Sequence, residues 1–195
     1  LGNGDRVPKH ALRVHVYGSV DELNSFLGLA RLGASKSILE YISRIQNDLF
    51  DLGGDLCFPL EDGENNKEYP PLRINDSQVK RLESEIDDMN SKLKPLKSFV
   101  LPGGSDISTY LHLCRTICRR AERLCVELST IEEVNPNSTK YLNRLSDWLF
   151  VASRITNNNG VSAVFDGVGK NTFAGSIACL KPRGMMVSFG NSSGS

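Results

Sequence analysis

The chain has 195 residues, and its 23 lysine and arginine residues balance its 23 aspartate and glutamate residues. This length suits one well-buried domain with an appendage and argues against two full domains. The charge balance excludes the overall basic character of a nonspecific nucleic-acid binder. No run approaches the roughly 18 apolar residues of a membrane span, and no signal-peptide pattern is visible, so we expect no membrane association.

Two amphipathic helices are predicted in the first third of the chain. Ser19 opens the pattern S-V-D-E, a capping box that predicts a helix from about residue 19 to 32. A second apolar periodicity predicts a helix over about 37–56 that stops near the glycine pair at 53–54. The polar, proline-bearing segment 57–74 is then expected to be a surface loop.

Three more helices are expected further along. One covers about 75–94, where a proline ends it. After the helix-breaking segment SFVLPGG, Ser105 or Asp106 caps a fourth helix, and Asn137 caps a fifth that runs to about residue 157. Five helices with no strand between them predict an all-α fold, a five-helix antiparallel bundle.

The fourth predicted helix has two different faces. Its apolar stripe consists of Leu111, Cys114, Cys118, Ala121, Cys125 and Leu128. The neighbouring face carries His112, Arg115, Arg119, Glu122 and Arg123, with Arg120 turned further away. Because arginines four residues apart repel one another, this row favours a bound anion, and a polyphosphate suits guanidinium groups beside a helix N-terminus. A solvated face, or salt bridges to neighbouring helices, remains the alternative, with Asp21 and Glu22 as candidate partners.

The five cysteines, an odd number, include three on that apolar stripe. One-sided helical spacing argues against a disulfide framework, and no paired C-x-x-C motif indicates zinc. His112 also lacks a second histidine or cysteine at metal-ligand spacing. We therefore expect buried free thiols in a reducing compartment, and no metal site.

The sequence pattern changes after Asn159. Residues 159–195 are predicted to form a short strand, a glycine turn, a short helix and a second strand. The expected organisation is therefore a helical bundle over 1–158 and an appended β/α tail over 159–195.

Three residues outside the arginine face are further candidates for ligand contacts. Lys9 lies near a turn, Phe99 precedes LPGG at the start of the arginine helix, and Asn143 lies off the apolar stripe of the fifth helix. Each has an ordinary alternative: solvation for Lys9, core packing for Phe99 and an exposed surface amide for Asn143.

Five segments together resemble the PduO-type ATP:cob(I)alamin adenosyltransferases, in order from about Gly4 to Arg154. They are RVPK, YGSVDELNSFLG, FVLPGGS, LHLCRTICRRAER and YLNRLSDWLF. The resemblance implies a homotrimer of five-helix bundles with active sites between subunits. The implied reaction moves the 5′-deoxyadenosyl group of ATP onto the cobalt of cob(I)alamin and releases triphosphate, with Mg²⁺ expected on the phosphates.

The resemblance also implies roles for single residues. The positions that match the ATP-binding residues are Lys9, Arg119, Arg120, Glu122, Arg123 and Asn143. Arg115 and Asp21 match an intersubunit ion pair, and Phe99 matches the aromatic residue below the corrin ring. The family's glycine- and threonine-rich phosphate loop is implied before Lys9, and the printed sequence does not include it.

About 35 residues of the tail resemble part of the zinc-independent quinone oxidoreductases. The G-x-G-x-x-G turn of a dinucleotide domain is missing, so we expect no redox activity. Two alternatives to the transferase remain: a carrier that delivers adenosylcobalamin, and an NADPH-dependent quinone reductase acting through the tail. The implied partners are a cobalamin reductase and an adenosylcobalamin-dependent acceptor enzyme, in the cytoplasm or, in a eukaryote, the mitochondrial matrix.

Overall fold

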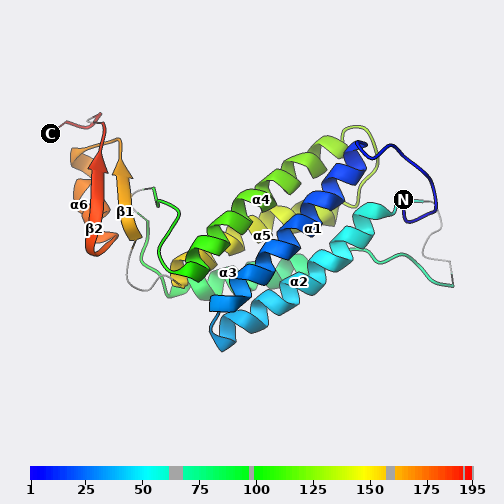
Figure 1. Ribbon diagram of the computed structural model, residues 1–195, viewed down its shortest axis with the longest axis horizontal. Helices are drawn as coiled ribbons and strands as arrows, with labels where there is room; N and C mark the ends of the chain where they lie inside the picture. Colours follow the sequence, from blue (N-terminus) through cyan, green and yellow to red (C-terminus); the bar gives the residue numbers. More distant parts are fainter. Residues whose placement is uncertain (62–67, 97–98, 157–160, 191, 195) are drawn as a thin grey trace.

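A computed structural model describes residues 1–61, 68–96, 99–156, 161–190 and 192–194. Five long helices pack side by side and form what we call the helical region, residues 12–156 (Figure 1). They are α1 (Leu12–Ala30), α2 (Lys36–Cys57), α3 (Asp76–Ser91), α4 (Asp106–Leu128) and α5 (Pro136–Ile155), with the 3₁₀ turn η1 (Arg31–Gly33) between the first two. No helix in the described residues is long and apolar enough to cross a membrane.

The tail, residues 161–194, lies beyond the end of the helical region where α4 begins and α5 ends (Figure 1). It consists of β1 (Val161–Asp166), α6 (Lys170–Ala178) and β2 (Leu180–Ser188). The two strands pair in parallel, and α6 connects them. The predicted order of strand, glycine turn, helix and strand is confirmed.

The core of the helical region lies between the apolar faces of the helices. Helix α1 packs against α2 and α4, α4 packs against α5, and α5 packs against α3. All six residues of the predicted α4 stripe are buried, and Tyr141 and Trp148 of α5 are fully buried. The stripe prediction for α4 is therefore confirmed, including its three buried cysteines.

The predicted start of α1 was wrong, whereas α2 keeps its predicted range of about 37–56 and only passes the glycine pair at which it was expected to stop. Helix α1 begins at Leu12, and Ser19 is buried inside it instead of capping it. Val16 and Val20 continue the apolar stripe toward the N-terminus, so burial extends the helix past the local capping signal. Helix α2 runs through the glycine pair to Cys57, because Leu52 and Leu56 on either side both pack in the core.

The caps of the other helices follow the sequence more closely. Asn75 caps α3 in a capping box with Gln78, and Ser105 caps α4 by accepting from the Ser108 amide. Helix α5 is capped by Asn135, not by Asn137 as predicted. Pro136 follows the cap at the first helical position, where its fixed φ angle suits a helix start.

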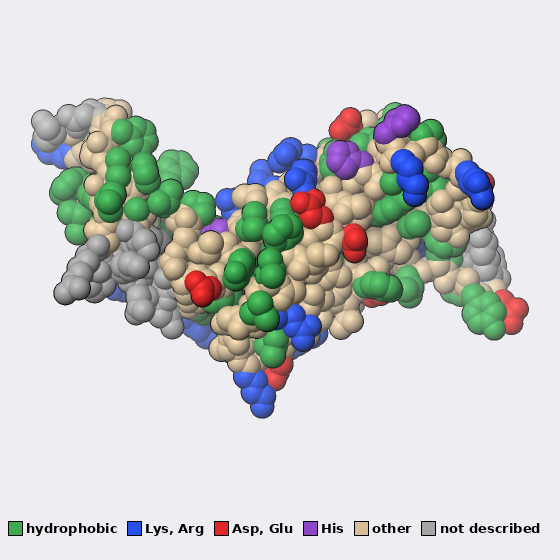
Figure 2. All heavy atoms as spheres, viewed as in Figure 1, with side chains coloured by type: hydrophobic (Ala, Val, Ile, Leu, Met, Phe, Trp, Pro, Cys, Tyr) green, Lys and Arg blue, Asp and Glu red, His purple; other side chains and the backbone are tan. Residues whose placement is uncertain are grey.

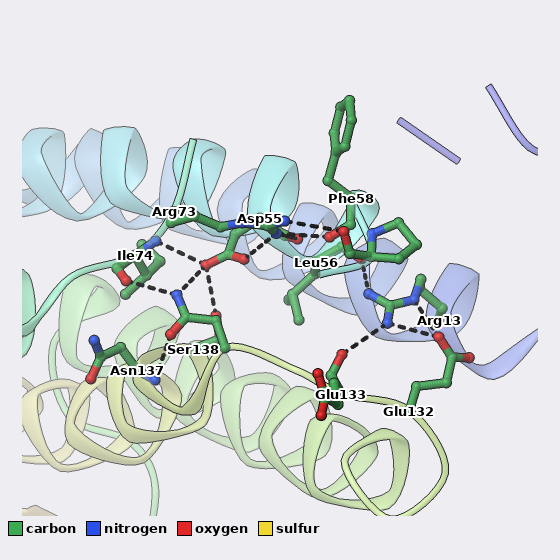
Figure 3. A network of polar contacts seen from close by, with 12 residues as sticks. Arg13, Asp55, Leu56, Phe58, Arg73, Ile74, Glu132, Glu133, Asn137 and Ser138 are labelled. Atoms are coloured by element: carbon green, nitrogen blue, oxygen red, sulfur yellow. Dashed lines mark hydrogen bonds and ion pairs between the residues drawn. The ribbon is translucent and has the colours of Figure 1, made fainter. Parts of the chain in front are cut away.

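A buried polar network joins the end of α2 to the start of α5 (Figure 3). The Asp55 carboxylate accepts from the Ile74 amide at 2.8 Å, from Asn135 Nδ2 at 2.7 Å and from Ser138 Oγ at 3.0 Å. The Arg73 guanidinium completes the set at 2.8 Å. We call these residues the Asp55 network. It fixes the chain before α3 and the N-terminus of α5 against the last turn of α2.

Candidate functional site

The charged face of α4 is accessible in the structure, and lysine and arginine side chains gather over α4 along the upper edge of Figure 2. Arg115, Arg119 and Arg123 follow one another at four-residue intervals, a rise of about 6 Å each. Arg119 and Arg123 are exposed. The ion pair that Arg119 makes, to Glu122, is long at 3.9 Å. Both guanidinium groups can therefore reach an anion in solvent.

Glu122 connects this face to α5. Its carboxylate accepts from Asn143 Nδ2 at 2.6 Å, while the Asn143 side-chain oxygen accepts from Arg144. Asn143 is thus a half-buried, oriented amide and not the freely exposed one of the ordinary alternative. The structure brings Arg119, Glu122 and Asn143 together, as the resemblance implied.

Arg120 points to a different helix. Its guanidinium pairs with Glu22 of α1, which links α1 and α4. Asp21, the neighbouring residue, is exposed and lines a polar pocket of about 590 Å³ between α1 and α2. No ion pair between described residues of one chain joins Asp21 to Arg115.

Two polar atoms of α4 are buried without a partner in the described part of the chain: His112 Nδ1 and Arg115 Nε. The His112 side chain is only 4% exposed, and its ring packs edge-on against Phe150, with 6.3 Å between ring centroids. Burial first, and the Arg115 charge second, lower the pKa of His112 to about 4. His112 therefore lies beside Arg115, as the helical spacing predicted, but it is buried and not accessible as the rest of the charged face is.

Phe99 is 89% exposed, which excludes the core-packing alternative. It lines an apolar pocket of about 550 Å³, which we call the Phe99 pocket. The helical region contributes Leu96, Phe99, Val100, Arg115 and Phe150. The tail contributes Phe165, Asp166, Gly167, Val168 and Thr172. Sequence reasoning missed the tail residues; Phe165 and Val168 on either side of Asp166-Gly167 were the available signal.

Lys9 lies at the other end of the helical region. It is exposed in the segment before α1, where the Ala11 amide donates to the Pro8 carbonyl at 2.9 Å. Arg13, four residues on, pairs with Glu132 beyond the end of α4. Lys9 is therefore near the end of α4, whereas Arg119 lies about 13 Å back along α4 from Leu128, the last residue of that helix. One chain does not bring Lys9 and Arg119 together.

The three cysteines on the α4 stripe are buried thiols with raised pKa values, so they are poor nucleophiles near neutral pH. Burial raises the pKa of Cys114 to about 12 and that of Cys118 well above its usual value. Burial also raises the pKa of Cys125. Among the described residues, no three histidine, cysteine, aspartate or glutamate side chains gather as a metal site. The candidate residues of this site that lie at the surface are arginines, a side-chain amide and an exposed aromatic ring.

Comparison with known proteins gives these features a context. A profile of the family "Cobalamin adenosyltransferase" matches residues 1–156. A corrinoid adenosyltransferase of Mycobacterium leprae is 46% identical over 164 residues, which cover 80% of this chain and 84% of the relative. A corrinoid adenosyltransferase of Bacillus subtilis is 43% identical and covers 79% of each chain.

Solved structures with a similar fold come from proteins of the same activity class as these relatives. One is a variant PduO-type ATP:corrinoid adenosyltransferase from Lactobacillus reuteri complexed with cobalamin and ATP. It superposes with a TM-score of 0.72 at 34% identity, and the match covers 80% of this chain and 86% of that one. A second variant of the same protein, complexed with ATP, gives a TM-score of 0.71. Both matches leave about a fifth of this chain uncovered.

Proposed function

The chain belongs to the cobalamin adenosyltransferase family, and we propose that the arginine row of α4 and the Phe99 pocket together form its site of adenosyl transfer. It is a corrinoid adenosyltransferase. The reaction forms a bond between the cobalt of cob(I)alamin and the 5′ carbon of ATP. It breaks the bond from that carbon to the 5′ oxygen, which leaves with the triphosphate.

The observation that carries this assignment is the position of Arg115. It lines the Phe99 pocket and also begins the arginine row, so that Arg119 follows one helical turn, about 6 Å, further on. An apolar ring bound in the pocket and a polyphosphate on the row would therefore lie side by side. Transfer from ATP to a corrinoid requires this arrangement, because the two reactants must be aligned at short distance.

The role of Arg119 is to stabilise charge on the departing triphosphate. Cob(I)alamin is a strong nucleophile, so the protein needs no catalytic base, and electrostatic stabilisation of the leaving group is its main contribution. Arg119 and Arg123 are exposed guanidinium groups suited to phosphate oxygens. The two Lactobacillus variants replace a phenylalanine and an arginine whose separation in that chain equals that of Phe99 and Arg119 here.

Glu122, Asn143 and Arg120 position the nucleotide. Glu122 and Arg144 hold the Asn143 amide by hydrogen bonds to its nitrogen and its oxygen, so its remaining N–H and the second lone pair of its oxygen have fixed directions and can serve a nucleotide. Arg120 is engaged with Glu22, and its proposed role is to fix α4 against α1 below the phosphates. Phe99 stacks beneath the corrin ring, excludes water and displaces the lower ligand, which makes the cobalt(II) precursor easier to reduce.

The proposed assembly is a homotrimer of five-helix antiparallel bundles. No ion pair joins Asp21 and Arg115 among the described residues of one chain, and Arg115 Nε is buried there without a partner, which supports a pair between Asp21 of one subunit and Arg115 of the next. The distance of Lys9 from Arg119 supports the same reading. We propose that Lys9 reaches the triphosphate bound by a neighbouring copy.

The described residues do not fit a protein-held Mg²⁺ ion, because no cluster of ligating side chains is present among them. The expected Mg²⁺ would therefore be bound with the ATP phosphates, and the roles given above concern the side chains of this chain only. We further propose a cobalamin reductase and an adenosylcobalamin-dependent enzyme as partners, in the cytoplasm or, in a eukaryote, the mitochondrial matrix. A reducing compartment suits the buried thiols of α4.

We propose that residues 1–158 form the catalytic domain and residues 159–195 an appended unit related to a quinone oxidoreductase fragment. The turn before α6 is not free to bind a dinucleotide phosphate. Its Val168 and Gly169 amides donate to the Asp166 carboxylate at 2.9 and 3.0 Å. This internal acceptor occupies the donors that a phosphate would need, which supports a tail without redox activity.

An anaerobic absorbance assay tests the proposed function. ATP is added to the protein and chemically reduced cob(I)alamin, and the spectrum is followed for adenosylcobalamin. We expect product in the presence of both substrates and none when ATP is replaced by ADP, which cannot release triphosphate. Absence of adenosylcobalamin with ATP would overturn the proposal.

A further inference from the structure

The Phe99 pocket has two walls that come from different parts of the chain. Phe99 and Phe150 belong to the helical region, whereas Phe165 and Val168 flank the turn between β1 and α6. The tail residues bring apolar surface to the pocket, since Phe165 is 44% and Val168 37% exposed. The profile of the family ends at residue 156, so the second wall comes from outside the matched region.

The turn that carries this wall is held in one shape from within. The buried Asp166 carboxylate accepts from the Val168 and Gly169 amides, from Thr172 Oγ1 at 2.7 Å and from Ser176 Oγ at 2.9 Å. These hydrogen bonds, led by that of Gly169, lower the pKa of Asp166 to about 2. The four hydrogen bonds occupy the Asp166 carboxylate, so the turn offers its apolar side chains to the pocket and not a free negative charge.

Close packing fixes the same turn from below. A Cβ atom at Gly190 would lie 2.2 Å from the Gly167 carbonyl oxygen, and one at Gly167 would lie 3.0 Å from the Phe189 ring. The Phe165 and Phe189 rings also pack together, with centroids 6.4 Å apart. The end of β2 thus supports the turn. Phe165 and Val168 are part of a preformed surface.

The tail stands beside Phe99 and does not cover it. Phe99 remains 89% exposed although Phe165 and Val168 line the same pocket. Between the described residues, no hydrogen bond or ion pair joins the turn residues 165–172 to the helical region. A flat ring can therefore stack on Phe99 while its edge meets the tail.

We propose that Phe165 and Val168 form a side wall of the corrin site, where they contact the apolar edge of a corrin ring stacked on Phe99. The inference rests on the proposed function. The periphery of the ring carries methyl groups between its amide side chains, so an apolar wall suits the methyl-bearing part of the edge better than solvent does. The tail is then a determinant of corrinoid affinity, with no part in ATP binding.

Titration of the full-length protein with cob(II)alamin, in the presence of ATP and without oxygen, tests this wall by absorbance. We expect Phe165→Ala to raise the Kd for cob(II)alamin by about three- to tenfold and to leave the KM for ATP unchanged. Phe173→Ala is the matched control, because Phe173 is also a half-exposed tail phenylalanine but lines a different pocket. We expect its Kd to stay within about twofold of wild type.

The outcomes separate the wall from the proposed function. If the wild-type protein binds cob(II)alamin and Phe165→Ala binds it as tightly, the wall is overturned and the function stands. Tighter binding by Phe165→Ala would show that the tail obstructs the ring, which also overturns the wall. If Phe165→Ala fails to fold by circular dichroism, Val168→Ala decides on the same criteria. A wild-type protein that binds no cob(II)alamin overturns both proposals.

Discussion

At the end of the helical region where α2 stops and α5 begins, the Asp55 carboxylate receives three hydrogen bonds and an arginine. At the opposite end, among the described residues, His112 Nδ1 and Arg115 Nε are buried with no partner. Folding leaves few buried polar atoms unpaired, because each costs free energy. The first end is therefore satisfied within one chain, whereas the unpaired Arg115 Nε at the second end supports the proposal that another molecule supplies a partner there.

The largest expected effect tests the end that contains the Asp55 network. Asp55→Ala removes the shared carboxylate acceptor of the Asp55 network, so that Arg73 loses its buried ion-pair partner and keeps only its bonds to backbone carbonyls. We therefore expect the free energy of unfolding to fall by about 3–5 kcal/mol. Urea denaturation followed by circular dichroism measures it. Asp88→Ala is the control, since Asp88 pairs with Lys92 at the surface and its loss costs about 1 kcal/mol or less. Equal losses would show that the network is not structural.

The next effect tests the opposite end of the helical region, where Arg115 and the arginine row lie. Arg119→Ala should lower kcat/KM for ATP, because a charge-assisted contact to phosphate is lost. The loss should correspond to about 1.5–3 kcal/mol of transition-state stabilisation. The Kd for cob(II)alamin should change little, because the guanidinium does not contact the ring. Lys80→Ala, an exposed cation on α3, should leave both values unchanged. Equal losses for ATP and corrinoid would contradict the assigned role.

A double-mutant cycle asks whether a second subunit supplies the partner of Arg115 at this end. Asp21→Asn and Arg115→Lys should each reduce kcat/KM and weaken the trimer, and together they should be less than additive, with a coupling of about 1–2 kcal/mol. Sedimentation measures the assembly, and steady-state kinetics measure the coupling. Strictly additive effects in an undisturbed trimer would show that the two residues do not pair.

The smallest expected effect concerns the buried imidazole. The pKa of His112 is lowered to about 4, so between pH 6.5 and pH 4 the unfolded chain binds more protons than the folded one. Its contribution to stability is complete above pH 6.5 and is lost as the pH falls. We expect wild type to lose about 1 kcal/mol from this group between pH 7 and 5.5.

His112→Phe should remove that share of the pH dependence of urea unfolding. His15→Phe is the control and should keep it, because His15 is exposed. An unchanged slope in His112→Phe would mean that the imidazole titrates normally in the folded protein.

The sequence predicted those features that depend on local pattern. The apolar stripe of α4, the Ser105 cap and the strand-turn-helix-strand order of the tail follow from spacing within a few residues. The start of α1 could not be predicted from local spacing, because the packing of Val16 and Val20 in the core outweighed the capping box at Ser19. Tertiary burial is stronger than a capping preference.

The candidate site also contains residues that could be predicted from the sequence and contacts that could not. Arg115, Arg119, Glu122 and Asn143 were named from helical spacing and family resemblance, and their mutual positions follow from two adjacent helices. The approach of Phe165 and Val168 to Phe99 could not be predicted, because it joins segments separated by more than sixty residues. The burial of His112 against Phe150 was not predicted, because periodicity gives a residue's face but not the neighbour that covers it.

The buried cysteines of α4 have a practical consequence for experiments. With raised pKa values, the thiols of Cys114, Cys118 and Cys125 hardly ionise near neutral pH and resist maleimide reagents. Cys57 and Cys179 are the half-exposed cysteines, one at the end of α2 and the other in the tail. A thiol-reactive dye pair is thereby directed to one site in each part of the molecule without prior mutagenesis. Energy transfer between the two dyes then reports any change in the spacing of the tail and the helical region as corrinoid is added.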